Sequence, residues 1–326
     1  MWMPRTLKGL LAALCIIAIS PAVTAQDKWP GKPIRIVSPF PAGGGNDVIA
    51  RQIAQGLSER VGVPVIVENR AGAAGTIGSE YVSKQPADGY TLGIGVVTTH
   101  SIAPSFYSQL RYDPVKDFTP MTMVATYEAV LVANPALGVN TLAELMQLAK
   151  VQPGKITFAS SGNGAWSHLG VELLNSKAGV KMVHVPYKGI PAAMTDLLGG
   201  RVDVLFDIAA SQHAHVKAGR LKALAVSSKS RSPLLPDVPT LSELGYPDFD
   251  SMVWLGLFAP PNMPPGLTAQ INADLVAVLR SKKLVDFLRE QGAQISTNTP
   301  AEFGEYIRED IVRWRRVMQA AGVQPQ

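Results

Sequence analysis

Cysteine is almost absent from this chain of 326 residues, and charged residues are scarce. The single cysteine, Cys15, lies near the N-terminus, so the rest of the chain can form no disulfide, no cysteine metal site and no thiol nucleophile. Asp, Glu, Lys and Arg make up 17% of the residues, against about 25% in typical proteins, while 47% of the residues are hydrophobic. This composition excludes a disordered or coiled-coil protein. The formal net charge of +5 is small and dispersed, which excludes a nucleic-acid-binding protein.

Residues 1–25 have the features of a cleavable signal peptide. Arg5 and Lys8 precede an apolar run from Leu10 to Ile19, and Val23-Thr24-Ala25 matches the small-residue cleavage pattern. The apolar run has about 10 residues, whereas a membrane-spanning helix needs about 20. We therefore expect an exported protein that resides in the periplasm and is not inserted in the membrane after cleavage.

Two other interpretations of this N-terminal segment remain open. It could be an uncleaved anchor, or Cys15 could carry a lipid. Leu14 stands where a lipid-modified cysteine needs a small residue, so the sequence favours cleavage after Ala25.

Strand-like and helix-like segments alternate along the rest of the chain. Short apolar runs bounded by turn residues are typical of buried strands, and amphipathic runs behind a capping residue are typical of helices. The expected strands are 33–40, 63–68, 90–97, 129–133, 155–161, 183–185, 202–207 and 221–227. The expected helices are 47–60, 76–84, 141–150, 166–178 and 191–198, followed by a helical tail from 268. This order predicts two units, each with a parallel sheet covered by helices.

Side chains at the helix ends support these assignments. Asn46, Thr141 and Thr299 are the expected N-caps of three of the helices. Gly179 is expected to end a fourth helix in the left-handed conformation.

A glycine-rich loop follows the first expected strand and precedes the first expected helix. The candidate ligand-binding residues in it are Phe40, Pro41, Ala42, Gly43, Gly44, Asn46 and Asp47. Glycines allow the backbone N–H groups to approach a ligand, and a helix N-terminus favours an anion. The loop lacks the Lys-Ser/Thr of a P-loop, and Val48 stands where a dinucleotide fingerprint needs glycine. A tight turn with a helix cap is the alternative, with Asp47 stabilising its own helix.

The second unit repeats this pattern. Its loop contains the candidate residues Ser160, Ser161, Gly162, Asn163 and Gly164, and the helix that follows carries Trp166 and His168. One such loop is common, but one in each unit indicates two halves that close on a single ligand.

The sequence contains no convincing catalytic or metal-binding pattern. The second loop lacks the leading glycine of a Gly-x-Ser-x-Gly nucleophile elbow. His168 and Glu172 are spaced as metal ligands can be, but no third ligand has suitable spacing. Asp207 ends an apolar strand, where it could bind a ligand or a backbone group. We therefore predict no cofactor, no metal and no enzymatic activity.

Six motifs together resemble one family. Residues 39–51, 67–78, 84–92, 160–174, 184–204 and 235–247 are similar to segments of the Bug receptors. These are the extracytoplasmic solute receptors of tripartite tricarboxylate transporters. The resemblance extends from about Trp29 to the C-terminus.

The resemblance implies an α/β protein with the type II periplasmic-binding-protein fold, in which two lobes joined by a hinge enclose an interlobe ligand cleft. The first lobe would comprise residues 26–125 and 253–326, and the second lobe residues 126–252. A small carboxylate would lie between the two loops, with Thr98, Thr99 and Asp207 near its far end. Trp166 departs from the family pattern, and it would narrow the pocket or stack on an aromatic acid.

The same resemblance implies a monomeric receptor that delivers its ligand to membrane permease subunits. Two alternatives from the sequence are an exported serine hydrolase that uses Ser161 and His168, and a ligand receptor for a signalling sensor.

Overall fold

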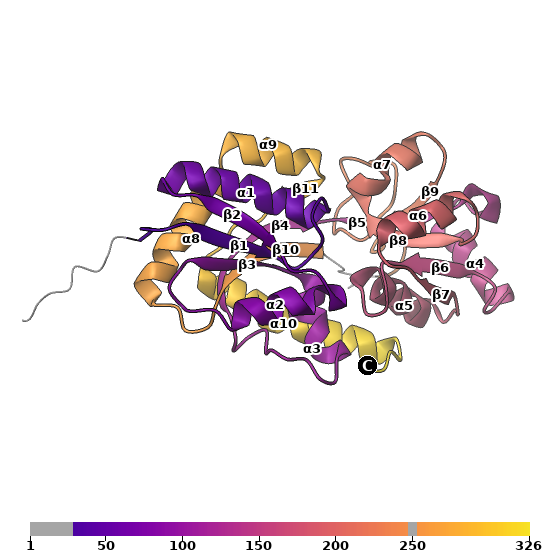
Figure 1. Cartoon of the computed structure of the whole chain (residues 1–326). Helices are drawn as coiled ribbons and strands as arrows, with labels where there is room; N and C mark the ends of the chain where they lie inside the picture. Colours follow the sequence, from indigo (N-terminus) through magenta and orange to yellow (C-terminus); the bar gives the residue numbers. More distant parts are fainter. Residues whose placement is uncertain (1–28, 247–252) are drawn as a thin grey trace, which may run out of the picture.

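The computed structural model describes residues 29–246 and 253–326, which form two α/β lobes, each with its own sheet (Figure 1). The predicted signal peptide and Cys15 lie outside these residues. The first lobe contains β1 (Ile34–Ser38), α1 (Gly45–Val61), β2 (Val65–Asn69), η1 (Ala73–Gly75), α2 (Thr76–Ser83), β3 (Thr91–Val96), η2 (Thr98–Ile102), α3 (Ala103–Phe106), β4 (Thr119–Tyr127), β10 (Val253–Ala259), α8 (Pro265–Leu279), α9 (Lys282–Glu290), β11 (Ala293–Ile295) and α10 (Pro300–Ala320). The second lobe contains β5 (Ala129–Ala133), η3 (Pro135–Leu137), α4 (Leu142–Val151), β6 (Thr157–Ser160), α5 (Trp166–Ala178), β7 (Val183–Pro186), α6 (Ile190–Leu198), β8 (Val204–Ile208), α7 (Ala209–Lys217) and β9 (Lys222–Val226).

The sheet of the first lobe has the order β11-β4-β10-β3-β1-β2. Its β1, β2 and β3 are parallel, as the strand–helix–strand order predicts. The prediction of a wholly parallel sheet is wrong, because β10 lies between β3 and β4 and is antiparallel to both. Strand β10 arrives from the far end of the chain, so it enters the sheet without the crossover helix that parallel pairing requires.

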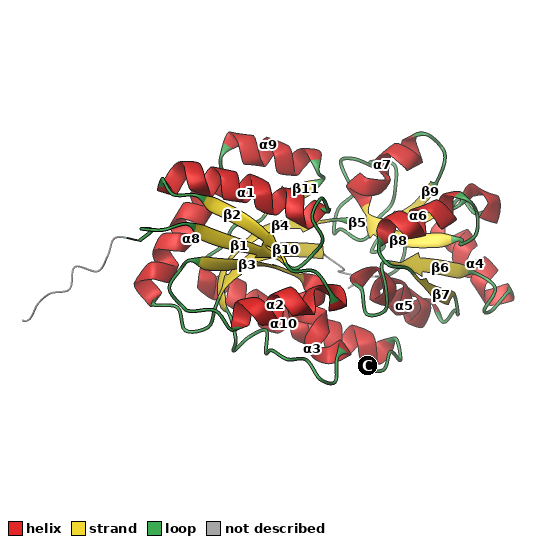
Figure 2. Cartoon of the chain, viewed as in Figure 1, coloured by secondary structure: helices red, strands yellow, loops and turns green. Residues whose placement is uncertain are grey.

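The sheet of the second lobe has the order β7-β6-β8-β5-β9, with β6 parallel to β7 and β8 and with β5 antiparallel to its two neighbours. Alternate side chains of a strand point to opposite faces. Accordingly Leu131 packs with α4 and α5, while Val130 and Val132 pack with α6 and α7. Figure 2 shows helices on both faces of both sheets.

The two lobes are joined where β4 continues into β5. Only Glu128 separates these strands, and its carboxylate accepts hydrogen bonds from Ser228 and Ser232 of the second lobe. Val253, the first residue of β10, pairs with Tyr127, the last residue of β4. The chain therefore leaves the first sheet and re-enters it at adjacent positions.

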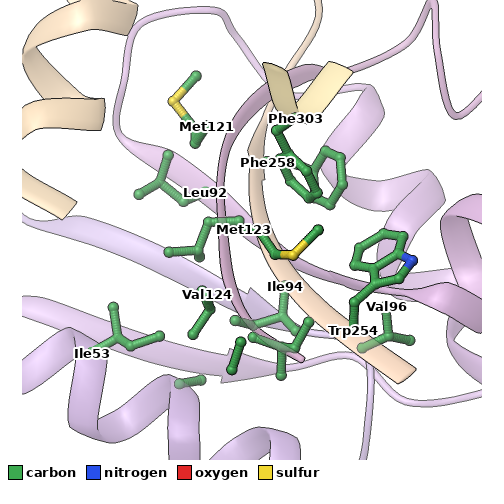
Figure 3. Packing of buried hydrophobic residues seen from close by; sticks show 14 of the residues in the cluster. Ile53, Leu92, Ile94, Val96, Met121, Met123, Val124, Trp254, Phe258 and Phe303 are labelled. Carbon is green, nitrogen blue, oxygen red and sulfur yellow. The ribbon is translucent and has the colours of Figure 1, made fainter. Parts of the chain in front are cut away.

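Two glycines make room for the aromatic core of the first lobe. Gly95 of β3 and Gly256 of β10 are directly paired. A β-carbon added at Gly95 would lie 2.2 Å from the ring of Phe258, and one added at Gly256 would lie 2.3 Å from the ring of Phe303. These two rings pack 5.1 Å apart between centroids, beside Trp254 and the side chains of β3 and β4 (Figure 3).

Most of the predicted helix ends are confirmed. The side chains of Thr141 and Thr299 accept hydrogen bonds from the backbone N–H three residues later, and Gly179 ends α5 in the left-handed conformation. The prediction for Asn46 is wrong: α1 begins at Gly45 with Gly44 as the extended N-cap residue, so Asn46 lies inside the first turn. The helical tail contains the short strand β11, which the sequence pattern does not predict.

Within residues 29–246 and 253–326, no helix combines the length and the apolar character that a membrane span requires.

We expect Gly95→Ala to lower the free energy of unfolding by about 1–3 kcal/mol, because the added methyl group overpacks the core against Phe258. The matched control is Gly266→Ala in the first turn of α8, where an added β-carbon meets nothing within 4 Å. Urea unfolding followed by circular dichroism measures both. Equal midpoints for the two variants would contradict this account of the core.

Candidate functional site

A cavity of about 300 Å³ lies between the lobes beside the Tyr127–Val253 pair. The first lobe lines it with Phe40, Gly45, Asn46, Val48, Ile49, Val96, Val97, Thr98, Tyr127, Val253, Trp254, Leu255, Phe287 and Gln291. The second lobe lines it with Ser161, Trp166, Ile208 and Ser211.

The lobes also contact each other at two places close in sequence to the residues that line this cavity. A β-carbon added at Gly164 of the second lobe would lie 2.5 Å from the ring of Phe106 in the first lobe. A β-carbon added at Gly292 of the first lobe would lie 2.2 Å from the Ala210 side chain in the second. Glycine at these two positions permits the close approach of the lobes.

Three helices begin at the cavity wall. The first turn of α1 lines the cavity through Gly45 and Asn46, that of α5 through Trp166, and that of α7 through Ser211. Backbone N–H groups in the first turn of a helix have no acceptor within the helix. They carry a partial positive charge and favour an anion. The cavity is therefore suited to a negatively charged ligand, although none of its lining residues carries a formal charge.

The buried carboxylate of Asp47 holds the loop that precedes α1 in place. Its carboxylate accepts hydrogen bonds from the N–H of Gly43, from the Asn69 amide at 2.7 Å and from the Arg51 guanidinium at 2.9 Å. The hydrogen bond from Arg51 is the main reason why the pKa of Asp47 is lowered to about 2. The side chain is 2% exposed and lies outside the cavity wall. It fixes the loop and leaves the adjacent N–H groups of Gly45 and Asn46 at the cavity.

Two stacked histidines support the second loop in a similar way. His168 and His184 lie with ring centroids 3.9 Å apart. The Nδ1 atom of His168 accepts a hydrogen bond from the Gly164 N–H, and Nε2 of His184 lies 2.6 Å from Ser160 Oγ. Burial lowers the pKa of both histidines to about 4, so both are neutral at neutral pH. They act as hydrogen-bonding supports beneath the loop.

Thr99 and Asp207 also make their hydrogen bonds within the protein. The hydroxyl of Thr99 is bonded to the backbone of Val96 and lies 2.9 Å from His100 Nδ1. Asp207 accepts a hydrogen bond from the Gln212 amide at 2.6 Å, and burial raises its pKa to about 6. Neither residue lines the cavity, although Ile208, which follows Asp207, and Thr98, which precedes Thr99, both do.

The structure divides the predicted site residues into two groups. At the cavity wall it brings together Phe40, Asn46, Thr98, Ser161 and Trp166. The other predicted residues do not line this cavity: Asp47, Thr99, Ser160, Gly164, His168 and Asp207 are buried, Gly162 is partly exposed, and Pro41, Ala42, Gly43, Gly44 and Asn163 are exposed. Six further residues of the wall are not predicted by any local pattern in the sequence, because they come together only through the pairing of β4 with β10 and the placement of α9; they are Tyr127, Val253, Trp254, Leu255, Phe287 and Gln291. In the sequence, the apolar run from Val253 to Ala259 could have indicated a buried strand at β10.

Ser161 and His168 are not arranged as a catalytic pair. The hydroxyl of Ser161 lies 3.3 Å from the Ser167 hydroxyl, and His168 Nδ1 is bonded to the Gly164 N–H. Ser160 does contact His184, but its side chain is fully buried. Among the described residues, no cluster of three His, Cys, Asp or Glu side chains has the geometry of a metal site.

A larger cavity, of about 1050 Å³, lies between α10 and the second lobe. Its lining contains more cationic than anionic side chains, namely Lys177, Lys229, Arg308, Arg313 and Arg316 against Glu305 and Glu309. No helix N-terminus of the described residues opens into it, whereas three helices begin at the wall of the smaller cavity. The smaller cavity is therefore the better candidate for a site that binds an anion through backbone N–H groups.

Comparison with known proteins agrees with this geometry. Residues 49–323 match the model of the tripartite tricarboxylate transporter family receptor. The chain is 36% identical to the protein BugT of Bordetella pertussis over 321 residues, which cover 96% of this chain and 97% of BugT. It superposes on the R. palustris protein Rpa4515 with adipate at a TM-score of 0.83 and 34% identity, covering 91% of this chain and 100% of that one. For MatC from Rhodopseudomonas palustris with bound malate, the TM-score is 0.79 and the identity 31%, over 88% of this chain and 99% of MatC.

Replacing Asp47 with alanine is expected to lower the free energy of unfolding by about 1–3 kcal/mol at pH 7, because it leaves buried donors without an acceptor. The pKa of Asp47 is lowered from an ordinary value of 3.8 to about 2, so its contribution to stability is present above about pH 4 and is lost as the pH falls toward 2. Urea unfolding at pH 7, 4 and 2.5 should show the difference from the native protein shrinking. Glu305→Ala, at an exposed ion pair, serves as control, and a difference that is equally large at pH 2.5 would be inconsistent with this role.

The neutral histidine pair predicts a second pH effect. In the unfolded chain both imidazoles have a pKa of about 6.5, against about 4 in the folded protein. As the pH falls from 6.5 to 4 the unfolded state binds these protons first, so stability decreases over that window. The double variant His168→Gln/His184→Gln should show a shallower decrease than the native protein in denaturant titrations. An unchanged slope in the double variant would refute the neutral pair.

Proposed function

Because the chain belongs to the tripartite tricarboxylate transporter receptor family, we propose that it is a solute receptor that binds a small carboxylate between its two lobes. It delivers this ligand to the permease subunits of the transporter and catalyses no reaction. The protein acts in the periplasm as a monomer, after removal of residues 1–25.

The observation that carries the proposal is the convergence of α1 and α5 on one cavity from opposite lobes. Each helix N-terminus stabilises an anion by about 0.3–1 kcal/mol, and by up to about 2 kcal/mol where it is partly buried. Hydrogen bonds from the Asn46 and Ser161 side chains add to this. Together they support micromolar affinity, which corresponds to about −8 kcal/mol. The similar structures that hold adipate and malate support the same ligand class.

Binding and closure are coupled by the position of the cavity. A carboxylate that accepts hydrogen bonds from both helix ends bridges the lobes, and it can do so only when they are close together. The ligand therefore stabilises the closed arrangement by its higher affinity for it. The junction at Tyr127, Glu128 and Val253 is the hinge about which the lobes would move, and closure would present the loaded receptor to the permease.

Gly45→Val tests this site directly. Gly45 lines the cavity at the start of α1, and an added β-carbon there meets no other atom within 4 Å. The valine side chain should therefore fill the carboxylate position without disturbing the fold. Isothermal titration of the mature protein (26–326), refolded to remove any carried-over ligand, is expected to show one carboxylate per chain for the native sequence and at least about a hundredfold weaker binding for Gly45→Val.

Gly266→Val, also in the first turn of a helix, should bind normally because Gly266 does not line the cavity and an added β-carbon there meets nothing within 4 Å. The titrated panel contains benzoate, hexanoate, adipate, malate and citrate, and ester hydrolysis is assayed in parallel. If well-folded native protein binds none of the panel, or hydrolyses esters in a manner that Ser161→Ala abolishes, the proposal fails.

A further inference from the structure

The larger cavity, of about 1050 Å³, is a groove with one bank in each lobe. Helix α10 of the first lobe forms one bank, from Glu305 to Ala320. The second lobe forms the other bank with Lys177 of α5 and with Ser228 and Lys229 in the segment after β9. Figure 1 shows α10 running beneath the first sheet toward α5. A molecule that lies in this groove therefore contacts both lobes.

Contacts between the lobes fix the two banks relative to each other. At the C-terminal end of α10, the Ser176 hydroxyl of α5 donates a hydrogen bond to the Ala320 carbonyl at 2.6 Å, and Val317 packs against the apolar core of the second lobe. At the hinge, the Ser228 hydroxyl donates a hydrogen bond to the Glu128 carboxylate. The groove therefore belongs to the assembled pair of lobes and to neither lobe alone.

Two arginines of the lining are paired along α10. The Arg308 guanidinium lies 2.5 Å from the Glu305 carboxylate, and Arg313 forms an ion pair with the buried carboxylate of Asp310. Each pair joins residues three positions apart, which are neighbours on the surface of a helix. These four side chains therefore largely neutralise each other's charge.

The remaining charges of the lining attract an anion. Lys177, Lys229 and Arg316 are exposed, and none of them forms an ion pair with a described residue. Against these three cations stands one acidic side chain outside the pairs, that of Glu309. Because the cations lie on both banks, the positive potential extends across the groove. The groove therefore favours a ligand that carries several carboxylates.

The groove also has apolar surface, and it is long. Leu173 is buried and Val317 is half-buried, whereas the Val312 side chain of α10 is 43% exposed. Between Glu305 and Ala320, α10 extends over about 22 Å at about 1.5 Å per residue. A small multivalent anion would leave the apolar side chains in water. A peptide segment with both acidic and apolar side chains would cover them and also pair with the cations.

We propose that this groove is the docking site for an acidic, amphipathic segment of a partner protein. The carboxylates of that segment pair with Lys177, Lys229 and Arg316, and its apolar side chains pack on Val312. A groove is concave, so a segment of chain fits it whereas a flat lipid surface does not. The inference goes beyond the proposed function, which concerns the smaller interlobe cavity, and it does not depend on the identity of the ligand there.

Two labelled synthetic peptides of about 15 residues, matched to the length of the groove, test the inference by fluorescence anisotropy with the mature protein (26–326). One peptide repeats glutamate pairs and leucine pairs, and in the other serine replaces every leucine. We expect saturable binding of the first peptide, at least about tenfold tighter than that of the second, and weaker binding as the salt concentration rises. Absence of saturable binding would overturn the inference. Tripolyphosphate that binds as tightly as the first peptide would also overturn it, in favour of a site for small anions.

Variants of the two banks separate docking from a general effect of charge. Lys177→Glu/Arg316→Glu reverses one cation on each bank and should weaken the first peptide by at least about tenfold, and Val312→Ser should weaken it by about fivefold. The control Lys150→Glu/Arg315→Glu makes the same change in net charge at exposed positions of α4 and α10 that do not line the groove, and it should bind as the native protein does.

Equal losses in the two double variants would overturn the docking site, because binding would then follow net charge alone. Urea unfolding of each variant verifies that the fold is intact. Sedimentation of the native protein tests a second copy of the chain as the occupant. Self-association that Lys177→Glu/Arg316→Glu abolishes would overturn the inference and assign the groove to a dimer.

Discussion

The pairing of β10 with β4 fixes how the two lobes are joined. Strand β4 leads through a single residue into β5 of the second lobe, and β10 returns to pair with β4 from its first residue onward. Because the β4–β5 junction and the start of β10 lie side by side, the two lobes are joined at one place. The residues that form this junction, Tyr127 and Val253, are also part of the cavity wall. Any movement of one lobe relative to the other therefore changes the width of the cavity.

At each of the two loops, the side chains that hold the loop backbone in place are different from the residues that line the cavity. Behind the first loop, Asp47 binds Gly43, Arg51 and Asn69, and behind the second, His168 and His184 hold Gly164 and Ser160. These buried hydrogen bonds fix the backbone in one conformation. As a result the free N–H groups of the helix ends are already oriented, and little conformational entropy is lost when an anion binds.

Much of this architecture could be predicted from the sequence because its signals are local. The period of apolar residues and the capping side chains of Thr141 and Thr299 lie within one segment and report that segment's structure. The antiparallel place of β10 could not be predicted in the same way, since it depends on a partner more than a hundred residues distant in the chain. Parallel sheets were the natural expectation for the alternating order, and they hold only for the strands within each strand–helix–strand unit.

Within the candidate site, the sequence indicated the two loops but not which of their groups face the ligand cavity. Asn46 and Asp47 are adjacent, yet Asn46 lines the cavity and the Asp47 carboxylate is bonded behind it. Ser160 and Ser161 differ in the same way, because Ser161 lines the cavity whereas the hydroxyl of Ser160 is bonded to His184. The direction of a loop side chain is set by partners such as Arg51, Asn69 and His184, which arrive from other elements. Loop composition therefore locates an anion site more readily than it assigns individual roles.

The central claim is that backbone N–H groups at the ends of α1 and α5 bind one carboxylate together. Titration of ²H,¹⁵N-labelled mature protein with sodium benzoate, followed by transverse-relaxation-optimised amide spectra, tests it most directly. The account predicts saturable shifts of the Gly45, Asn46, Trp166 and Ser167 amide resonances that fit a single Kd. Saturable shifts confined to the cavity between α10 and the second lobe, with these four amides unmoved, would contradict it.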